Sequence, residues 1–89
     1  MVVLTFSFGK LKHSVSINPP LSRQELLDAL LVVFPSIERI GGVVIDGTVS
    51  VLNDALIAET LLAHPEQVYE LSATARSGSS SSSSSSSST

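Results

Sequence analysis

The chain has no cysteine and no tryptophan, and its aromatic residues are only three Phe and one Tyr. Without cysteine, disulfide bonds, thiolate metal sites and a cysteine nucleophile are excluded, and nothing indicates an oxidising compartment. We therefore expect a cytoplasmic protein. Four aromatic residues are also too few for the stacking surfaces of proteins that bind single-stranded nucleic acid.

Basic residues are scarce as well. Five are spread along the chain against eight acidic residues, which gives a net charge of −3. The lack of a basic cluster argues against a nucleic-acid partner. No apolar run approaches the roughly 20 residues of a membrane-spanning helix, so no membrane partner is expected. The charge favours a protein partner whose approaching surface is basic.

The end of the chain is a low-complexity segment. Ten serines at 79–88 precede Thr89, and no apolar side chain among them offsets the entropy lost on ordering. We expect a single domain over residues 1–76 and a disordered serine-rich tail over residues 77–89. Hydrophobic residues still make up 43% of the whole chain, so the domain has enough Val, Leu and Ile for a core.

The first half of the domain shows two clear patterns. Apolar and polar residues alternate over residues 2–8 and again over 11–17, which predicts a β-hairpin with one face against a core. Ser22 and Glu25 have the spacing of a capping box, and apolar residues then recur at helical spacing. The helix is predicted to end at about residue 34, because the next residue is proline.

Short β-prone runs follow the helix, and turn-forming pairs separate them. A short turn is expected at residues 36–39, and strands are expected at 43–45, 49–52, 56–57 and 68–73. The turn-forming pairs are Gly41-Gly42, Asp46-Gly47 and Asn53-Asp54. The first is expected to be a turn, whereas either of the other two fits a hairpin, and the sequence does not decide between them.

A two-stranded hairpin cannot bury its own apolar face, so the helix must cross the sheet and the last strand must pair with the hairpin. This is an α+β arrangement of the β-grasp (ubiquitin-like) kind, with a mixed sheet of four to five strands crossed by one main helix. One face of each element is predicted to form the core: Leu4, Phe6, Phe8, Val15, Ile17, Leu27, Leu30, Leu31, Val51, Val68 and Leu71.

In this order of elements the chain resembles the ubiquitin-like sulfur carriers, the family of the molybdopterin synthase small subunit, the thiamine-pathway sulfur carrier and the ubiquitin-related modifier. The resemblance covers residues 1–78. It rests on three segments: residues 30–35, 51–57 and 66–68. The interval from Asn53 to Gly78 is also similar to the distance at which the family places its terminal Gly-Gly.

The resemblance implies a role in molybdenum cofactor biosynthesis or a related pathway, with Gly78 as the carrier terminus. After removal of the tail, an adenylating, ubiquitin-activating-like enzyme would act on the Gly78 carboxylate. The carboxylate would become a thiocarboxylate, and a larger catalytic subunit would use its sulfur. The chain itself would be no enzyme and would hold no cofactor. Two features depart from the family: Ser77 stands in place of the first glycine, and eleven residues follow Gly78.

The alternative is a non-catalytic ubiquitin-like interaction module, PB1-like or adaptor-like, and a third option is an idealised domain with an artificial serine linker. The predicted partner surface is the sheet face turned away from the helix, with Arg76 near the terminus. The residues placed on this face are Val3, Thr5, Ser14, Ser16 and Tyr69. Tyr69 is the predicted anchor, since a rigid exposed aromatic buries much area for little entropy. Its alternative role is to pack over the sheet edge and complete the fold.

His13 and His64 are the residues that most invite a catalytic or metal role. Neither has a partner at a metal-ligand spacing, so both are expected to be structural. No serine lies in a Gly-x-Ser-x-Gly nucleophile elbow. The sequence therefore predicts no catalytic residue and no metal site.

Overall fold

The computed structural model of the chain describes residues 1–76. The elements follow in the order β1 (Val2–Phe8), β2 (Leu11–Ile17), α1 (Arg23–Val33), β3 (Ile37–Ile45), β4 (Thr48–Val51), α2 (Asp54–Leu56), the π-helical segment η1 (Ile57–Leu61) and β5 (Val68–Ala75). Helices and one sheet share a core, so the predicted α+β class is confirmed. The predicted tail, residues 77–89, lies outside the described residues.

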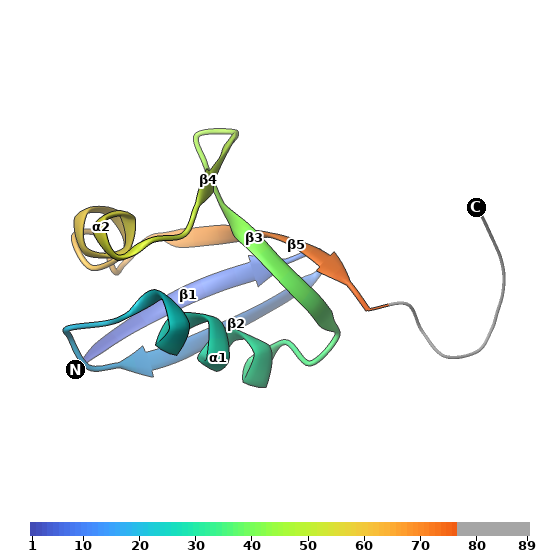
Figure 1. Ribbon diagram of the computed structural model, residues 1–89, viewed down its shortest axis with the longest axis horizontal. Coiled ribbons are helices and arrows are strands. Elements are labelled where there is room, and N and C mark those ends of the chain that lie inside the picture. Colours follow the sequence, from blue (N-terminus) through green and yellow to red (C-terminus); the bar gives the residue numbers. More distant parts are fainter. Residues whose placement is uncertain (77–89) are drawn as a thin grey trace, which may run out of the picture.

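The five strands form one mixed sheet in the order β2-β1-β5-β3-β4. The N-terminal hairpin is confirmed, because β1 and β2 pair in antiparallel fashion over their whole length. β5 inserts between β1 and β3, parallel to β1 and antiparallel to β3. α1 connects the hairpin to β3 and lies along one side of the sheet (Figure 1).

Asp46 and Gly47 form the second hairpin turn, which the sequence left undecided. They join β3 to β4 with φ angles of 54° and 76°, the left-handed conformation that tight two-residue hairpin turns require. Asn53 instead begins a helix, since its Oδ1 accepts a hydrogen bond from the Leu56 N–H at 2.7 Å. The strand expected at residues 56–57 is therefore wrong, because these residues belong to α2 and η1.

Gly41 and Gly42 lie inside β3, so the turn expected there is wrong. Of the short turn expected at residues 36–39, only Ser36 lies in a turn. β3 already begins at Ile37. A Cβ atom on Gly42 would collide with the backbone carbonyl of Ser50 on β4. Gly42 therefore permits the close approach of two strands and does not turn the chain.

Helix α1 begins after Ser22, as predicted, but the capping box does not form. The Ser22 side chain makes no capping hydrogen bond. The N–H of Arg23 donates instead to Oδ1 of Asp54, at 3.0 Å, so a carboxylate from the start of α2 lies at the positive end of α1. The helix ends at Val33, and the Phe34 N–H donates to the Leu30 carbonyl at 2.8 Å. Pro35 then prevents continuation.

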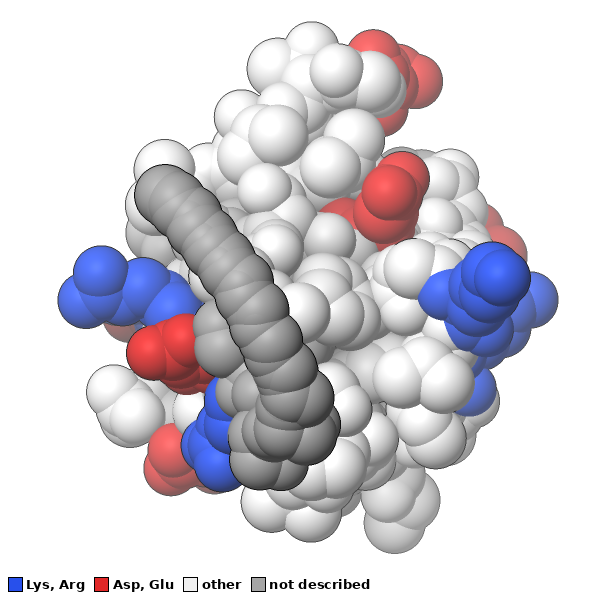
Figure 2. Space-filling view, turned by 90° about the vertical axis from the view of Figure 1, so that its right-hand side faces the viewer, with Lys and Arg blue, Asp and Glu red and all other residues white. Residues whose placement is uncertain are grey.

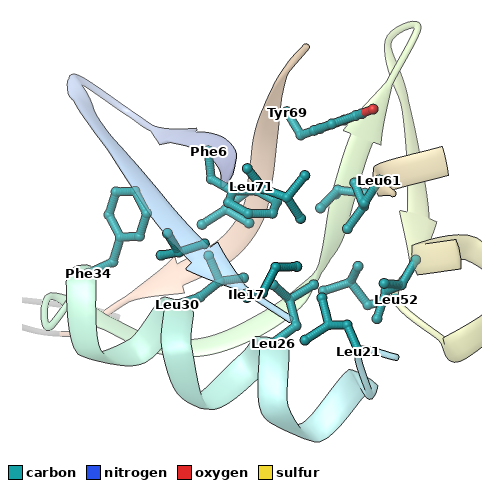
Figure 3. Packing of buried hydrophobic residues seen from close by; sticks show 14 of the residues in the cluster. Phe6, Ile17, Leu21, Leu26, Leu30, Phe34, Leu52, Leu61, Tyr69 and Leu71 are labelled. Carbon is teal, nitrogen blue, oxygen red and sulfur yellow. The ribbon is translucent and has the colours of Figure 1, made fainter. Parts of the chain in front are cut away.

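The core lies between the sheet and the helical segments (Figure 3). Its fully or almost fully buried residues are Leu4, Phe6, Val15, Ile17, Leu21, Leu26, Leu30, Phe34, Ile37, Val43, Leu52, Ile57, Leu61, Tyr69 and Leu71. Six of these were predicted, and two further predicted residues, Phe8 and Leu27, are half-buried against them. The larger part of the core that the prediction missed comes from β3, from residues 52–61 and from Tyr69.

Three predicted core residues are exposed: Leu31 (38%), Val51 (69%) and Val68 (50%). Leu31 lies one residue beyond the buried stripe of α1, which runs through Leu26 and Leu30 to Phe34. Val51 and Val68 occupy strand positions of the wrong parity and point away from the core. The error is thus a rotation or a slip by one residue in each element.

We expect Leu30→Ala to lower the free energy of unfolding by about 2–5 kcal/mol, because it empties a fully buried site beneath α1. Val32→Ala is the matched control on the same helix: Val32 is 77% exposed, so its change should stay within about 0.5 kcal/mol. Urea denaturation of the two variants measures both values. Equal midpoints would show that the buried face of α1 is assigned wrongly.

Candidate functional site

The β1 and β2 residues that the sequence assigned to a partner surface lie on one side of the sheet. Val3 is exposed and Thr5 is half-buried, and both alternate with the buried Leu4 and Phe6, so they lie on the sheet face opposite the core. Thr5 is paired across the hairpin with Ser14, and their hydroxyl oxygens are 3.5 Å apart. The prediction that these residues point away from the helix is therefore confirmed.

We call this side of the sheet the outer face, defined by Val3, Thr5, Ser14, Ser16, Val44, Val49, Val51, Val68, Glu70 and Ser72. The strand register places these residues on one side. Val68 lies beside Thr5 across the parallel ladder of β1 and β5. Val3 precedes Thr5 on the same side of β1. Val44, Val49 and Val51 form a second apolar area on β3 and β4. Glu70 and Ser72 of β5 lie between the two areas.

Tyr69 does not belong to the outer face, contrary to the prediction. Its side chain is only 3% exposed, and its ring is 6.2 Å from that of Phe6, measured between centroids. The hydroxyl lies within hydrogen-bond distance of two backbone carbonyl oxygens, of His64 at 2.8 Å and of Thr60 at 3.0 Å. Figure 3 shows the ring in the core with its hydroxyl directed to the side where Leu61 lies. Tyr69 therefore ties the chain around η1 to β5 and offers no exposed anchor.

The residues of the predicted carrier terminus lie at the end of the described chain or beyond it. Arg76 is exposed, and its N–H donates to the carbonyl oxygen of Ser36, in the loop after α1, at 2.6 Å. Ser77 and Gly78 lie outside the described residues. The backbone is thus hydrogen-bonded up to the residue that directly precedes them.

The two histidines and Tyr69 have the following surroundings. His13 packs edge-on against Phe34, with ring centroids 4.8 Å apart. His64 is exposed, and its Nδ1 lies 3.7 Å from a carboxylate oxygen of Glu66. Burial raises the pKa of the Tyr69 hydroxyl, and the negative charge of Glu66 raises it further. The hydroxyl has one proton, and the carbonyl oxygens of Thr60 and His64 share it as acceptors.

Metal-binding groups and membrane-spanning helices are two further features to consider in residues 1–76. No group of three or more His, Asp or Glu side chains in this part of the chain is arranged to hold a metal ion. None of its helices is long and apolar enough to cross a membrane. Figure 2 views the end of the molecule near the end of β5, where side chains of both signs lie close together on the left and a group of Lys and Arg side chains lies on the right.

Comparison with protein-family models, with curated proteins and with solved structures found no match to this chain. The expected relation to sulfur carriers therefore stays a prediction. The outer face, with its two apolar areas, is the candidate site that the described residues offer.

We expect Tyr69→Phe to lower the free energy of unfolding at neutral pH by about 1 kcal/mol, because it removes the hydroxyl donor. The pKa of Tyr69 is higher in the folded than in the unfolded chain, so ionisation favours unfolding. The stability contribution is complete below the unfolded pKa, at about 10, and is lost as the pH rises through the folded value.

Urea midpoints of the wild type and Tyr69→Phe, measured between about pH 8 and pH 11, test this assignment. The difference between them should shrink at the alkaline end, since the variant has no phenol to ionise. Parallel pH profiles would mean that the Tyr69 hydroxyl is solvated in the folded protein.

Proposed function

We propose that the chain is a β-grasp, ubiquitin-like protein that acts as a non-catalytic interaction module. The strand order, with a parallel central pair and the main helix on one side, supports this fold. The single observation that carries the function is the outer face. Four exposed valines, Val3, Val49, Val51 and Val68, lie there in two areas, and exposed apolar side chains rimmed by polar residues are typical of a protein-binding site.

The proposed partner is a protein that presents apolar side chains around a basic group. Glu70 lies between the two valine areas, in register with Ser7 on one side and Val44 on the other. A lysine or arginine of the partner would meet its carboxylate while apolar side chains cover Val68 and Val51. The net charge of −3 favours the approach of such a basic surface.

Val68→Lys should abolish this interaction without unfolding the domain. The Val68 side chain is half exposed at the start of β5, so we expect a change in stability within about 0.5 kcal/mol. A photo-crosslinking residue at position 3, beside Val68, should form one defined adduct in host cells, identified by mass spectrometry. The adduct should be lost in the Val68→Lys background.

Val32→Lys on α1 is the control, because it adds the same charge to an exposed valine away from the outer face. It should leave the adduct unchanged. An adduct that persists with Val68→Lys would exclude the outer face as the binding surface.

The second candidate function is that of a sulfur carrier, with an adenylating enzyme and a larger catalytic subunit as partners and Gly78 as the reactive terminus. One observation favours it. The backbone is held by strand pairing at Ala75 and by a hydrogen bond from Arg76 to Ser36. A chain that ends at Gly78 would therefore extend only a short way beyond a backbone position that the fold holds in place. A short extension from a rigid strand is what insertion into an enzyme channel requires.

The carrier function predicts that the chain isolated from its host ends at Gly78, with one terminal oxygen replaced by sulfur in part of the population. Intact-mass measurement before and after alkylation with a thiol reagent detects both changes. The interaction module predicts a chain that still ends at Thr89. If Thr89 is present in every molecule, the carrier function is excluded and the outer-face proposal is unaffected.

A further inference from the structure

The edge of β3 next to α1 is a second candidate surface, and it adjoins the outer face at Arg39, which pairs with Thr74. β4 pairs with β3 only from Gly42 to Ile45. On that side, the stretch from Ile37 to Ile40 has no strand neighbour among the described residues, while its other side pairs with β5. A free strand edge presents backbone N–H and C=O groups that an extended peptide can pair with.

A groove runs along this edge, between β3 and α1, with a volume of about 240 Å³. Its apolar part is formed by Leu27 and Leu31 of α1 and by Ile40 of β3. Leu31 was predicted to be in the core, but its side chain is exposed and lines this groove. The groove is therefore apolar enough to accept a side chain of the size of Val or Ile.

The charges around the groove select the chemistry of its ligand. Arg23 and Arg39 both line it, and neither forms an ion pair within residues 1–76. Two of the five basic residues of an acidic chain thus stand at one groove. Glu38 is the one carboxylate among the lining residues and opposes them, while Gln24 is engaged with Asp28 at 3.3 Å. Among the lining residues alone, the two arginines outnumber the carboxylate of Glu38. A further carboxylate, that of Asp54, lies near Arg23, because it accepts a hydrogen bond from the Arg23 N–H.

We propose that this groove binds a short extended segment of a partner protein that carries an apolar side chain flanked by carboxylates. The backbone of the segment pairs with β3 at residues 37–40. Its apolar side chain packs on Leu27, Leu31 and Ile40, and its carboxylates accept hydrogen bonds from the guanidinium groups of Arg23 and Arg39. The two bulges of β3, near Glu38 and Gly41, limit the pairing to a few residues, so the segment is short.

The comparable groove on the other side of α1 has a different chemistry. It is lined by Ile17, Asn18, Leu21 and Ala29, with Glu25 as its charged residue, and it lies beside β2, which is also an edge strand. A carboxylate-bearing segment would meet Glu25 there instead of two arginines. This groove therefore serves as the internal control for the charge argument.

The test is an NMR titration of the full chain with the peptide acetyl-Asp-Asp-Val-Ile-Val-Asp-Asp-amide. We expect the backbone amides of residues 37–40 and of the facing side of α1 to shift, and the affinity to fall as salt is raised. Arg39→Ala should weaken binding about tenfold, the effect of losing one charge-assisted pair. Glu38→Gln should strengthen it, because it removes the opposing carboxylate.

The matched peptide with Lys in place of each Asp should not shift residues 37–40, and Arg76→Ala should leave the affinity for the acidic peptide unchanged. An unchanged melting temperature of Arg39→Ala shows that its effect is on binding. Absence of shifts at millimolar peptide, equal binding of the lysine peptide, or shifts confined to β2 or to the outer face would each overturn the proposal. A loss of shifts at residues 37–40 leaves the proposal for Val68 and the outer face untouched.

Discussion

β1 and β5 lie side by side in the middle of the sheet, and they run in the same direction. Parallel neighbours cannot be joined by a tight turn, so the chain between them must leave the sheet and return. α1 and the helical segments after β4 do this, and the residues that they bury, such as Leu26, Leu30 and Leu61, form the core on one side. The contact of Phe6 with Tyr69 lies on this central ladder and joins the two ends of the domain.

A consequence of this connection is that one sheet face remains uncovered. The helical segments and their buried residues share the inner side, and no described element packs on the outer face. The exposed residues of that face are mostly small or hydroxyl-bearing, apart from the valines on β1, β4 and β5. Threonine and serine hydroxyls form hydrogen bonds with water on a solvated strand, whereas the apolar side chains of Val68 and Val51 would be more favourable out of water. Their presence is the physical reason to expect a partner.

The sequence predicted an element correctly where its pattern of apolar residues fits only one structure. In β1 every second residue from Val2 to Phe8 is apolar and the others are mostly polar, so both its strand state and its inward face were predictable. β5 has apolar residues at both parities, Val68 as well as Tyr69 and Leu71, and the pattern alone could not choose between the two faces. Only the paired register with β1 settles that Tyr69 faces Phe6. The predicted side-chain orientation was therefore right for Val3 and Thr5 on β1 and wrong for Tyr69 on β5.

The prediction for the region after β4 was wrong for a different reason. Asn53-Asp54 fits a hairpin turn and a helix start equally well, because Asn side chains accept from backbone N–H groups in both. The tertiary contact from Asp54 to the start of α1 favours the helix, and no local pattern contains that information. The spacing of Ile57 and Leu61, which are both buried, was a helical signal that the β-branched character of the run concealed.

Strand β3 links the two proposed surfaces. Its Val44 contributes to the outer face, while its first residues form the edge of the groove beside α1. The close approach of β4 at Gly42 fixes the strand between these two parts, so backbone changes in β3 would disturb both surfaces together. Side-chain changes are more local, because Arg39 and Val68 belong to different strands. Arg39 lines the groove, and its pairing with Thr74 also places it at the rim of the outer face. The opposite charges of the two surfaces, Glu70 on one and two arginines at the other, would let one small domain hold a basic partner and an acidic segment at once.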